Sequence, residues 1–391
     1  MSTKSVDIAI VGGGVMGCSI AYHLAQADPT LAIVVIERDP TYARASSTLS
    51  LGNVRVQFSL AENIAISQHT FAVLERFADD MEVEGERPEI GFRREGNLFL
   101  VDRASERAVR RDLEQQQRLG CRVEWWSTDE MEGRLPLLAP GELVGGTFGV
   151  DDGHLDGYAL LMGYRRKAAS LGCALMEAEV AAIRQTAAGR IAGVDLADGG
   201  RLASGIVVNC AGAWAAAVAE TAGLELPVAP VQRQVFVVEP AVRPEQRWPL
   251  IGLPNGLYFR SEGDDRIVVG RSLPEDRVGF DFQWQESRFN EHLWPALVEI
   301  VPSLERLRLE RGWTGLYAVN RFDGNALLGE WPEIEGLYLA CGFSGHGLQQ
   351  APAVGRYLSE LILGRPHALD LSVFSSQRLL TGRRVHERGL V

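Results

Sequence analysis

A strand, a glycine-rich turn and a helix follow one another at the start of the chain, and this order restricts the fold more than any other feature. Residues 6–11 form an apolar run typical of a buried parallel strand. Gly12, Gly14 and Gly17 then have the spacing G-x-G-x-x-G, with the apolar periodicity of a helix beyond them. The pattern predicts the first strand, turn and helix of a Rossmann-like dinucleotide-binding unit in an α/β fold.

Each glycine in this turn has a mechanical reason. Gly12 allows the tight turn, Gly14 lets the backbone approach a pyrophosphate, and Gly17 lets the helix pack closely on the strand. The pyrophosphate then lies at a helix N-terminus, where free N–H groups and the helix dipole favour negative charge. A second apolar run, 32–36, ends at Glu37, which lies about 20 residues after the turn and is placed to accept hydrogen bonds from a ribose.

Length and charge exclude several classes of protein. A chain of 391 residues with 46% hydrophobic and 23% charged residues has globular composition and is long enough for two domains. Its net charge of −12 argues against a nucleic-acid surface and against electrostatic attachment to anionic lipid.

Cysteine usage and hydropathy predict a compartment and exclude a metal site. The five cysteines form no C-x-x-C pair, which predicts reduced thiols, no metal centre and a cytoplasmic location. No apolar run is long enough to span a membrane. We interpret the N-terminal apolar run as the nucleotide-binding strand rather than a signal peptide, because it lacks a basic flank and a small-residue cleavage site.

The strand, small-residue turn and helix pattern occurs three times. After the first turn, an apolar run at 206–208 leads into NCAGAW at 209–214, and a strand at 336–340 leads into CGFSGHG and a helix that ends near residue 363. An NAD enzyme with two mononucleotide-binding halves would not need the third turn, whereas a large flavin dinucleotide lying across the domain explains all three. Elsewhere the sequence predicts helices over 61–77, 104–119 and 286–300, a helix capped by Asp156, a strand at 97–101, and a hairpin at 197–200.

Two discontinuous domains follow from this reading. We expect residues 1–90, 146–225 and 321–391 to form the FAD-binding domain. Residues 91–145 and 226–320, which contain RQVFVVE, GLYFRS and RIVVG, are expected to form an inserted antiparallel-sheet domain for the substrate.

Six motifs, in this order, resemble those of the D-amino-acid-oxidase-like flavoproteins, in the sarcosine oxidase and glycine oxidase branch. They are VGGGVMG with its following acid, ASSTLSLGNVR, DDGHLD, VVNCAGAW, DGNALLG and CGFSGHG. Two stretches also resemble mitochondrial flavoproteins that assist assembly of respiratory complex I, and bacterial secondary-amine oxidases of the iminodiacetate type are similar too. The resemblance implies a glutathione-reductase-like fold and a bound FAD.

The resemblance also implies which residues bind the flavin. Ser46 and Ser47 are expected to donate hydrogen bonds to phosphate or flavin oxygens. The N–H groups of 345–347 and the dipole of the last long helix are expected to face the pyrimidine end of the flavin. The side chain of His346 is expected to cap or pack. The full expected set is Gly12, Gly14, Val15, Met16, Gly17, Glu37, Arg38, Ser46, Ser47, Thr48, Val180, Ala211, Gly212, Trp214, Gly315, Gly342, Ser344, Gly345, His346, Gly347, Leu348 and Gln349.

The mode of flavin attachment and the electron acceptor can be read from three positions. Relatives with covalent flavin use a cysteine where this chain has Gly315, or a histidine where it has Thr48, so we predict non-covalent FAD. Sarcosine oxidases place an oxygen-activating lysine where this chain has Val268, which favours an acceptor other than oxygen.

The same resemblance implies the catalytic set. Arg55 is expected to hold a substrate carboxylate through its planar guanidinium, although a surface arginine or internal ion pair is the alternative. Tyr317 is expected to cap the substrate pocket and Tyr258 to line it, although either could be a plain core tyrosine. Gln349 replaces a second cation found in relatives, so we expect one cation in the pocket. We interpret Arg233, together with Arg271, as structural.

These residues predict an FAD-dependent oxidase or dehydrogenase that oxidises the C–N bond of a small amino acid. An N-substituted substrate such as sarcosine or iminodiacetate is the first expectation. The alternatives are a D-amino acid dehydrogenase with a non-oxygen acceptor, and a flavin-containing assembly or binding protein with little catalysis. The oligomeric state is left open.

Overall fold

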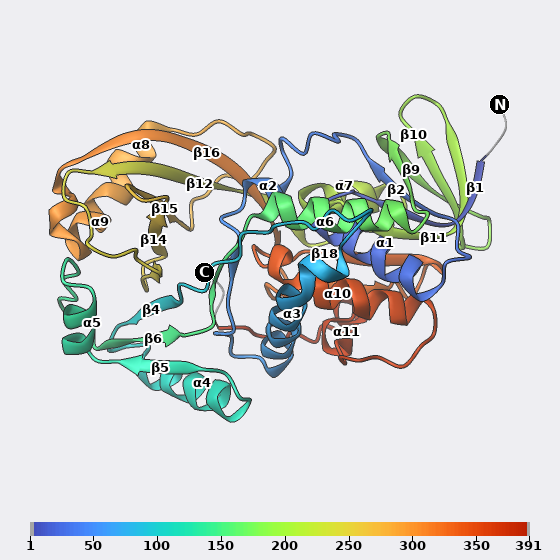
Figure 1. Cartoon of the computed structure of the whole chain (residues 1–391). Coiled ribbons are helices and arrows are strands. Elements are labelled where there is room, and N and C mark those ends of the chain that lie inside the picture. Colours follow the sequence, from blue (N-terminus) through green and yellow to red (C-terminus); the bar gives the residue numbers. More distant parts are fainter. Residues whose placement is uncertain (1–3, 389–391) are drawn as a thin grey trace.

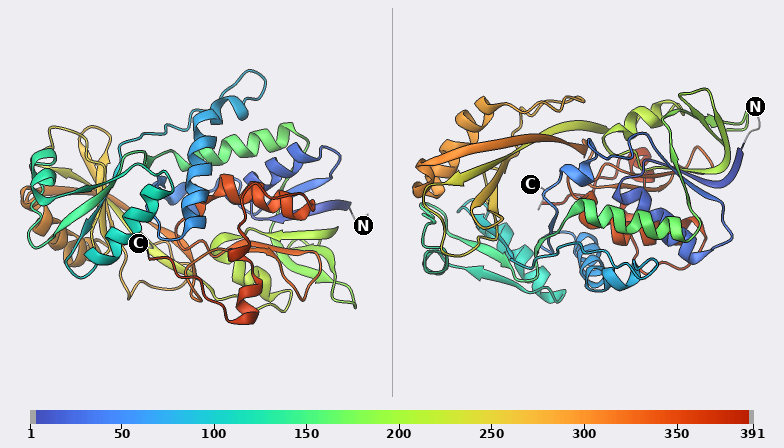
Figure 2. Two further views of the ribbon diagram at one scale, coloured as in Figure 1. Left: turned by 90° about the horizontal axis from the view of Figure 1, so that it is seen from below. Right: turned by 45° about the horizontal axis from the view of Figure 1, so that its top comes forward.

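Two sheets, each with its own helices, make up the protein, and the two parts lie side by side (Figure 1). The computed structural model describes residues 4–388, so the outermost residues of the expected 1–90 and 321–391 segments lie outside the described part of the chain. Figure 2 shows from two further sides that the N-terminal strand lies at one end of the molecule, far from the helices of the second sheet. The predicted α/β fold with a Rossmann-like part is confirmed.

The first sheet is built around parallel strands. Its order is β17-β18-β11-β1-β2-β8, with β9 and β10 extending it as an antiparallel hairpin beside β11. Pairing is parallel throughout the path except between β17 and β18. The strands are β1 (Lys4–Val11), β2 (Ile33–Glu37), β8 (Ala174–Glu177), β9 (Val180–Gln185), β10 (Ile191–Leu196), β11 (Arg201–Asn209), β17 (Leu327–Glu330) and β18 (Leu337–Cys341).

Successive residues of β1 point into two different cores, which explains its uniformly apolar sequence. Ile8 and Ile10 contact the core formed with the long helices, whereas Ala9 and Val11 contact the core on the opposite face. In the first core α1 packs against both α6 and α10, and α10 packs against α3. The elements of this part are α1 (Val15–Ala27), α3 (Ala61–Asp80), α6 (Gly157–Ser170), α10 (Gly347–Ile362) and, on the other face, α7 (Ala215–Glu220).

Helix α6 begins where the sequence predicts. The carboxylate of Asp156 accepts hydrogen bonds from the backbone N–H groups of Tyr158 (2.9 Å) and Ala159 (3.0 Å), which satisfies two donors of the first turn.

The second sheet is mainly antiparallel, as expected for the substrate side. Its order is β16-β12-β15-β14-β13-β4-β6-β5, and only β13 and β4 pair in parallel. The strands are β4 (Asn97–Val101), β5 (Val123–Trp126), β6 (Gly145–Gly149), β12 (Val228–Pro240), β13 (Leu250–Gly252), β14 (Leu257–Glu262), β15 (Arg266–Arg271) and β16 (Leu307–Asn320). One face packs on a core with α5 (Thr128–Arg134) and α9 (Trp294–Ile300).

Two details differ from the expectations. Strand β6 pairs with β4 and β5, so the division expected before residue 146 falls instead after Gly149. The helix expected over 286–300 is interrupted, because α8 (Glu286–Arg288) is followed by a π-helical turn at Phe289–Leu293 before α9 begins.

Short elements connect the two parts. They are α2 (Ser46–Leu49) and a two-stranded ladder of β3 (Asn53–Val54) with β7 (Gly153–His154). Helix α4 (Glu106–Arg118) packs on β5 of the second sheet, and α11 (Gln377–Thr381) packs on the core of the first. Near its C-terminal end the chain returns to the first part. There the buried carboxylate of Glu387 accepts hydrogen bonds from the backbone N–H of Ser59 (2.7 Å) and of Leu60 (3.0 Å), at the start of α3.

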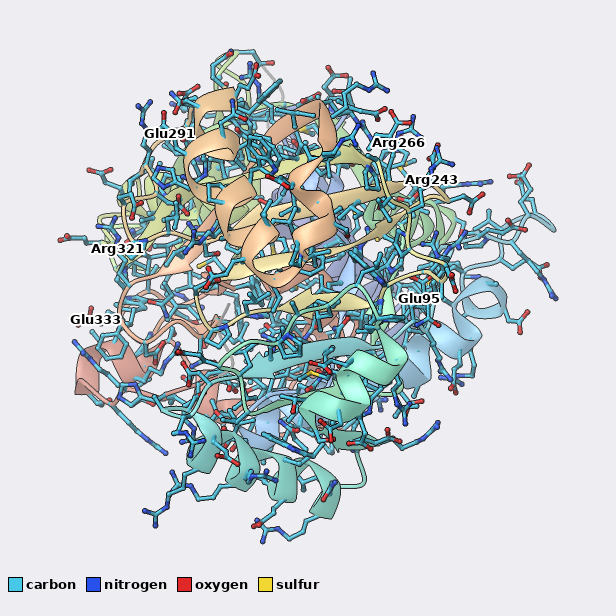
Figure 3. All side chains as sticks on the ribbon, turned by 90° about the vertical axis from the view of Figure 1, so that its left-hand side faces the viewer. Glu95, Arg243, Arg266, Glu291, Arg321 and Glu333 are labelled. Atoms are coloured by element: carbon cyan, nitrogen blue, oxygen red, sulfur yellow. The ribbon has the colours of Figure 1, made fainter. Side chains whose placement is uncertain are left out.

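The outer end of the second sheet is covered with charged side chains (Figure 3). Arg243 and Arg266, which lie near each other in this view, both pair with Asp265. Exposed pairs of this kind contribute about 0–1 kcal/mol each, so they add solubility rather than stability. Among residues 4–388, no helix has the length and hydropathy needed to cross a lipid bilayer.

Candidate FAD and substrate site

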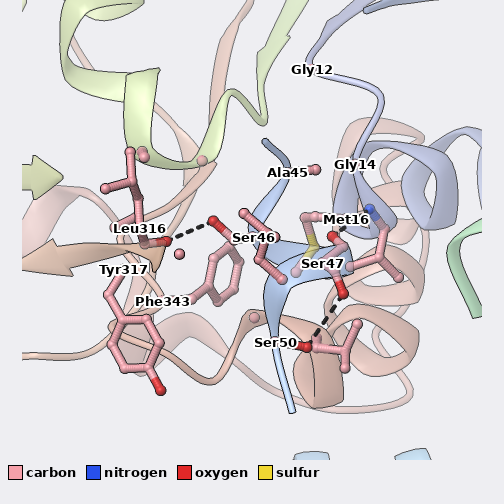
Figure 4. A pocket seen from close by; sticks show the side chains of 18 of the residues that line it. Gly12, Gly14, Met16, Ala45, Ser46, Ser47, Ser50, Leu316, Tyr317 and Phe343 are labelled. Atoms are coloured by element: carbon pink, nitrogen blue, oxygen red, sulfur yellow. Dashed lines mark hydrogen bonds between the residues drawn. The ribbon is translucent and has the colours of Figure 1, made fainter. Parts of the chain in front are cut away.

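A cavity of about 800 Å³ lies between the carboxyl ends of the parallel strands and one face of the second sheet. This is near the upper end of the range of about 300–1,000 Å³ for ligand sites, and its position is the usual ligand site of an open α/β sheet. All three predicted turns contribute to its wall, through residues 11–16, 210–214 and 343–349. Figure 4 shows the part of the cavity between the first turn and β16.

The first turn leaves no room for side chains. Gly12 has a φ of +101°, and a Cβ there would lie 2.6 Å from the carbonyl oxygen of Cys210. A Cβ on Gly17 would lie 2.0 Å from the carbonyl oxygen of Gly12. Gly17 therefore sets the close approach of α1 to the turn, as predicted, and it does not itself line the cavity.

Glu37 holds the turn from the end of β2 and also lines the cavity. Its carboxylate accepts hydrogen bonds from the backbone N–H groups of Gly13 (2.8 Å) and Asp39 (2.9 Å). A carboxylate has about four acceptor positions, so two remain for a ribose.

The three hydroxyl groups of α2 have different roles. Ser47 Oγ accepts from the backbone N–H of Val15 (3.2 Å), which leaves its own proton for a cofactor oxygen (Figure 4). Ser46 Oγ instead donates to the carbonyl of Leu316 (2.7 Å), so the expected donation to the cofactor is not what the structure shows for this hydroxyl. Thr48 donates to the carbonyl of Tyr42 (2.6 Å) and does not line the cavity, contrary to expectation.

The third turn brings the N-terminus of α10 to the cavity. Ser344 and Gly345 have φ values of +49° and +100°, and a Cβ on Gly345 would lie 2.4 Å from the ring of Tyr317. The tyrosine ring thus lies directly on the turn, beside the first N–H groups of a 16-residue helix. Gly342, with a φ of +71°, shapes this turn but does not line the cavity, so its expected contact with the cofactor stays a prediction.

The register of the second sheet determines which of its side chains face the cavity, because directly paired residues share a face. Val235 pairs with Gly270, and Gly270 pairs with Tyr258. A Cβ on Gly270 would lie 2.3 Å from the hydroxyl of Tyr258, so this glycine lets the ring lie across its neighbour strand. Tyr258 and Tyr317 line the cavity as predicted.

Arg55 lines the cavity and is 4% exposed. Its Nη1 donates to the carbonyl of Gln57 (3.0 Å), and its guanidinium lies 4.4 Å from the ring centroid of Phe58 and 5.0 Å from that of Phe99. Burial lowers the pKa of Arg55, and the negative charges of Glu387 and Asp152 oppose that effect. The expectation of a cavity-facing cation is met, and the surface alternative is not.

His346 is a direct partner of Arg55, which the sequence did not indicate. Nη2 of Arg55 lies 3.1 Å from Nε2 of His346. A guanidinium can only donate, so Nε2 accepts and the proton is on Nδ1. Burial and then the charge of Arg55 lower the pKa of His346 to about 3, so the ring is neutral at physiological pH.

A buried acid lies behind Arg55. Asp152 accepts hydrogen bonds from the backbone N–H of Val56 (2.8 Å) and from Nε2 of Gln57 (2.8 Å). Burial raises the pKa of Asp152 to about 7, although these hydrogen bonds and the charge of Arg55 lower it. The motif DDGHLD therefore contributes a carboxylate that holds the two residues after Arg55 in place.

Gln349 positions Arg55 from the other side. Its Oε1 accepts from the backbone N–H of Arg55 (2.9 Å), across 294 residues of sequence. Gln349 lines the cavity as expected, but its amide is engaged with the protein backbone.

The two arginines interpreted as structural differ in their position relative to the cavity. Arg271 donates to the carbonyls of Asn255 (3.2 Å) and His292 (2.7 Å) and lies outside the cavity. Arg233 lines the cavity, with its guanidinium carbon 5.1 Å from the ring centroid of Tyr317, so the cavity has two cations on its substrate side rather than one. Phe99, which is also in the cavity wall, was missed because its place depends on sheet register.

The residues present fit FAD. The first turn and Glu37 can hold the adenosine and pyrophosphate, and the Ser344–Gly347 turn with the dipole of α10 can hold the pyrimidine end of the ring. Asn53, which lines the cavity, has a buried Oδ1 with no hydrogen-bond partner among the described residues, as expected where a ligand supplies the donor. The remaining expected cofactor residues all line the cavity, namely Gly14, Val15, Met16, Arg38, Val180, Ala211, Gly212, Trp214, Gly315 and Leu348.

Comparisons with known proteins agree with an FAD-binding fold. A family model described as FAD dependent oxidoreductase (DAO) matches residues 7–361. The curated protein "FAD-dependent oxidoreductase domain-containing protein 1" of Bos taurus is 34% identical over 97% of this chain and 86% of its own length. Among solved structures, the L-proline dehydrogenase of P. horikoshii has a TM-score of 0.86 and 25% identity, covering 98% of this chain and 100% of that one. The iminodiacetate oxidase of Chelativorans sp. BNC1 has a TM-score of 0.77 and 25% identity, covering 94% and 98%.

The matched region begins in β1 and ends in α10, so it contains all three turns and both sheets. The chain belongs to the FAD-dependent oxidoreductase family of the D-amino-acid oxidase type, with FAD as its cofactor.

Proposed function

We propose that this protein oxidises the C–N bond of a small amino acid, with an N-substituted, secondary amine as the preferred substrate. The observation that carries the proposal is the buried guanidinium of Arg55 in the cavity wall, where its Nη2 contacts Nε2 of His346. Two structural neighbours, an L-proline dehydrogenase and an iminodiacetate oxidase, are named for secondary amines, which supports a substrate of this class.

Arg55 and Tyr317 are the residues that would bind the acid of such a substrate. A guanidinium has five N–H donors, and the hydrogen bonds to Gln57 and His346 are among the contacts that orient its plane. The hydroxyl of Tyr317 has no hydrogen-bond partner among the described residues, so it can donate to a carboxylate. FAD, when bound, supplies the two-electron acceptor.

Among residues 4–388, no side chain in the cavity wall near Arg55 is suited to remove a proton from the amine, and Asp152 lies behind Arg55, outside that wall. His346 is neutral, but its pKa of about 3 makes it a weak base. The carboxylates that line the cavity are Glu37, Asp39 and Glu179, which lie at the nucleotide end. The substrate therefore enters as the neutral amine, and the protein's part is to orient it and to exclude water.

An acceptor other than oxygen is part of the proposal. Val268, at the position where sarcosine oxidases have a lysine, is 1% exposed. It packs in a small apolar cluster with Val235, Val237, Leu51 and Trp313. A dehydrogenase that passes electrons to a quinone or another carrier fits the apolar residue at this position. Steady turnover with a quinone or dye acceptor under argon, with little hydrogen peroxide formed in air, is the expected result.

The proposed oxidation is tested by anaerobic titration of the FAD-loaded protein. Sarcosine, iminodiacetate, L-proline, glycine and D-amino acids are added separately at millimolar concentration, and flavin absorbance is followed. Bleaching by a secondary amine supports the proposal, and bleaching only by a D-amino acid moves the substrate to that class. A flavin that no amine bleaches contradicts the proposal and favours the assembly or binding role.

All five cysteines are free and buried, which supports the predicted reducing compartment, although the compartment stays a prediction.

A further inference from the structure

Arg233 has an edge of its guanidinium that nothing in the described protein fills. Its Nη1 donates to a carboxylate oxygen of Asp276 (2.5 Å) and to the carbonyl of Gln232 (3.2 Å). Nε is buried, and neither it nor Nη2 has a hydrogen-bond partner among residues 4–388. The N–H groups of Nε and Nη2 lie in the guanidinium plane and point along the same edge. This edge is the fork that binds a carboxylate through two hydrogen bonds.

Asp276 does not neutralise this arginine completely. The same carboxylate is paired with Arg288, and all three side chains are at most 15% exposed. Two guanidinium groups therefore share one carboxylate, so Asp276 alone does not balance the charge of both. A buried cation without a full counter-ion is costly, so the site favours an anionic ligand.

The backbone directs Arg233 toward the substrate end of the cavity. On β16 its partner is Gly315, which has no side chain, and the next pair on the same face is Val231 with Tyr317. The guanidinium of Arg233 therefore lies over the tyrosine ring. Burial raises the pKa of Tyr317 and the charges of Arg233 and Arg55 both lower it, so the phenol lies within the fields of both arginines.

The geometry points to a substrate with two acidic groups: one held by Arg55 and the second held through the Nε–Nη2 edge of Arg233. The substrate class is an amino acid whose nitrogen or short side chain has a second carboxylate. This inference rests on the proposed amine oxidation and adds to it the residue that selects among amines. A ligand with a single carboxylate on Arg55 would leave the Nε–Nη2 edge of Arg233 without an acceptor.

The test is a binding measurement that does not require oxidation. Thiodiacetate and (methylthio)acetate, in which sulfur replaces the amine nitrogen, differ only in the second carboxylate. Their dissociation constants for the FAD-loaded protein are measured from the flavin difference spectrum and by calorimetry. We expect the diacid to bind about 10- to 100-fold more tightly, as for a charged hydrogen-bonded pair, and Arg233→Gln to bring the ratio close to one.

Two further variants make the result decisive. Arg233→Lys keeps the charge but not the fork, so an intermediate ratio is expected. Arg277→Gln removes an exposed arginine that lines a separate small polar cavity next to Asp276, and it should leave the ratio unchanged. Equal binding of the two acids by the wild type, or an equal loss of both in Arg233→Gln, overturns the inference. If the diacid binds selectively but no amine bleaches the flavin, the amine oxidation fails while the second-acid site stands.

Discussion

Nη2 of Arg55 lies 3.1 Å from Nε2 of His346, and this contact joins residues 291 positions apart at the centre of the substrate site. The histidine acts as an acceptor for a permanent cation, so it must stay neutral for the contact to persist. The pKa of His346, lowered to about 3, keeps it neutral over the whole range in which the protein is expected to work.

Stability should depend on pH through His346. Between pH 6.5 and about 3 the unfolded chain binds a proton at this histidine and the folded protein does not. The free energy of unfolding therefore rises with pH over this window and decreases as the pH falls. The loss between pH 7.5 and 5 is about 2 kcal/mol. Urea unfolding of His346→Gln, in which this group cannot titrate, should show a pH dependence weaker by that amount. His292→Gln, at an exposed histidine, is the control and should match the wild type.

Affinity for acidic ligands should fall as pH rises through about 7. Asp152 becomes ionised there, and its new negative charge behind Arg55 repels an anion in the cavity. At an effective dielectric constant of 20–40 the effect is about 1 kcal/mol, or about fivefold in the dissociation constant. Asp152→Asn should remove this pH dependence, whereas Asp151→Asn, whose carboxylate pairs with Arg122 near the surface, should keep it. An unchanged pH profile in Asp152→Asn would show that another group titrates.

Gly17 should be essential for cofactor retention. An alanine Cβ there would lie 2.0 Å from a backbone carbonyl oxygen, so α1 must move away from the turn. We expect Gly17→Ala to destabilise the protein by about 1–3 kcal/mol or more and to lower its FAD content after purification. Gly205→Ala, where a Cβ meets nothing within 4 Å, should keep both stability and flavin. The measurements are the melting temperature and the ratio of visible to ultraviolet absorbance.

FAD should dissociate when the protein is denatured. The two positions at which relatives attach flavin are Gly315, which has no nucleophile, and Thr48, whose hydroxyl donates to the backbone carbonyl of Tyr42 and which does not itself line the cavity. Precipitation with trichloroacetic acid should leave the yellow colour in the supernatant. Colour that stays with the pellet would reveal an attachment residue elsewhere.

Local features of this site could be predicted from the sequence, whereas contacts between distant segments could not. Gly12, Gly17 and Glu37 were recognised because turn, helix and acid are close in sequence and each requires a particular residue type. The helix cap at Asp156 was found for the same reason.

The errors concern side chains whose neighbours are set by sheet register or by long-range packing. The place of Arg233 in the cavity wall cannot be predicted in this way, because nothing in the sequence shows that its partner on β16 is Gly315, or that Asp276 is shared with Arg288. The link between Gln349 and Arg55 was likewise invisible. Thr48 was misplaced because a short helix turns one of three consecutive hydroxyl groups away from the cavity.

Two hydrogen bonds join α2 to β16, from Ser46 to the carbonyl of Leu316 and from the indole of Trp313 to the carbonyl of Leu49. The loop at the nucleotide end of the cavity is therefore hydrogen-bonded to the strand that contains Tyr317. A displacement of that loop is therefore expected to move Tyr317 as well, so that cofactor binding would also affect the end of the cavity where we propose that the amine binds.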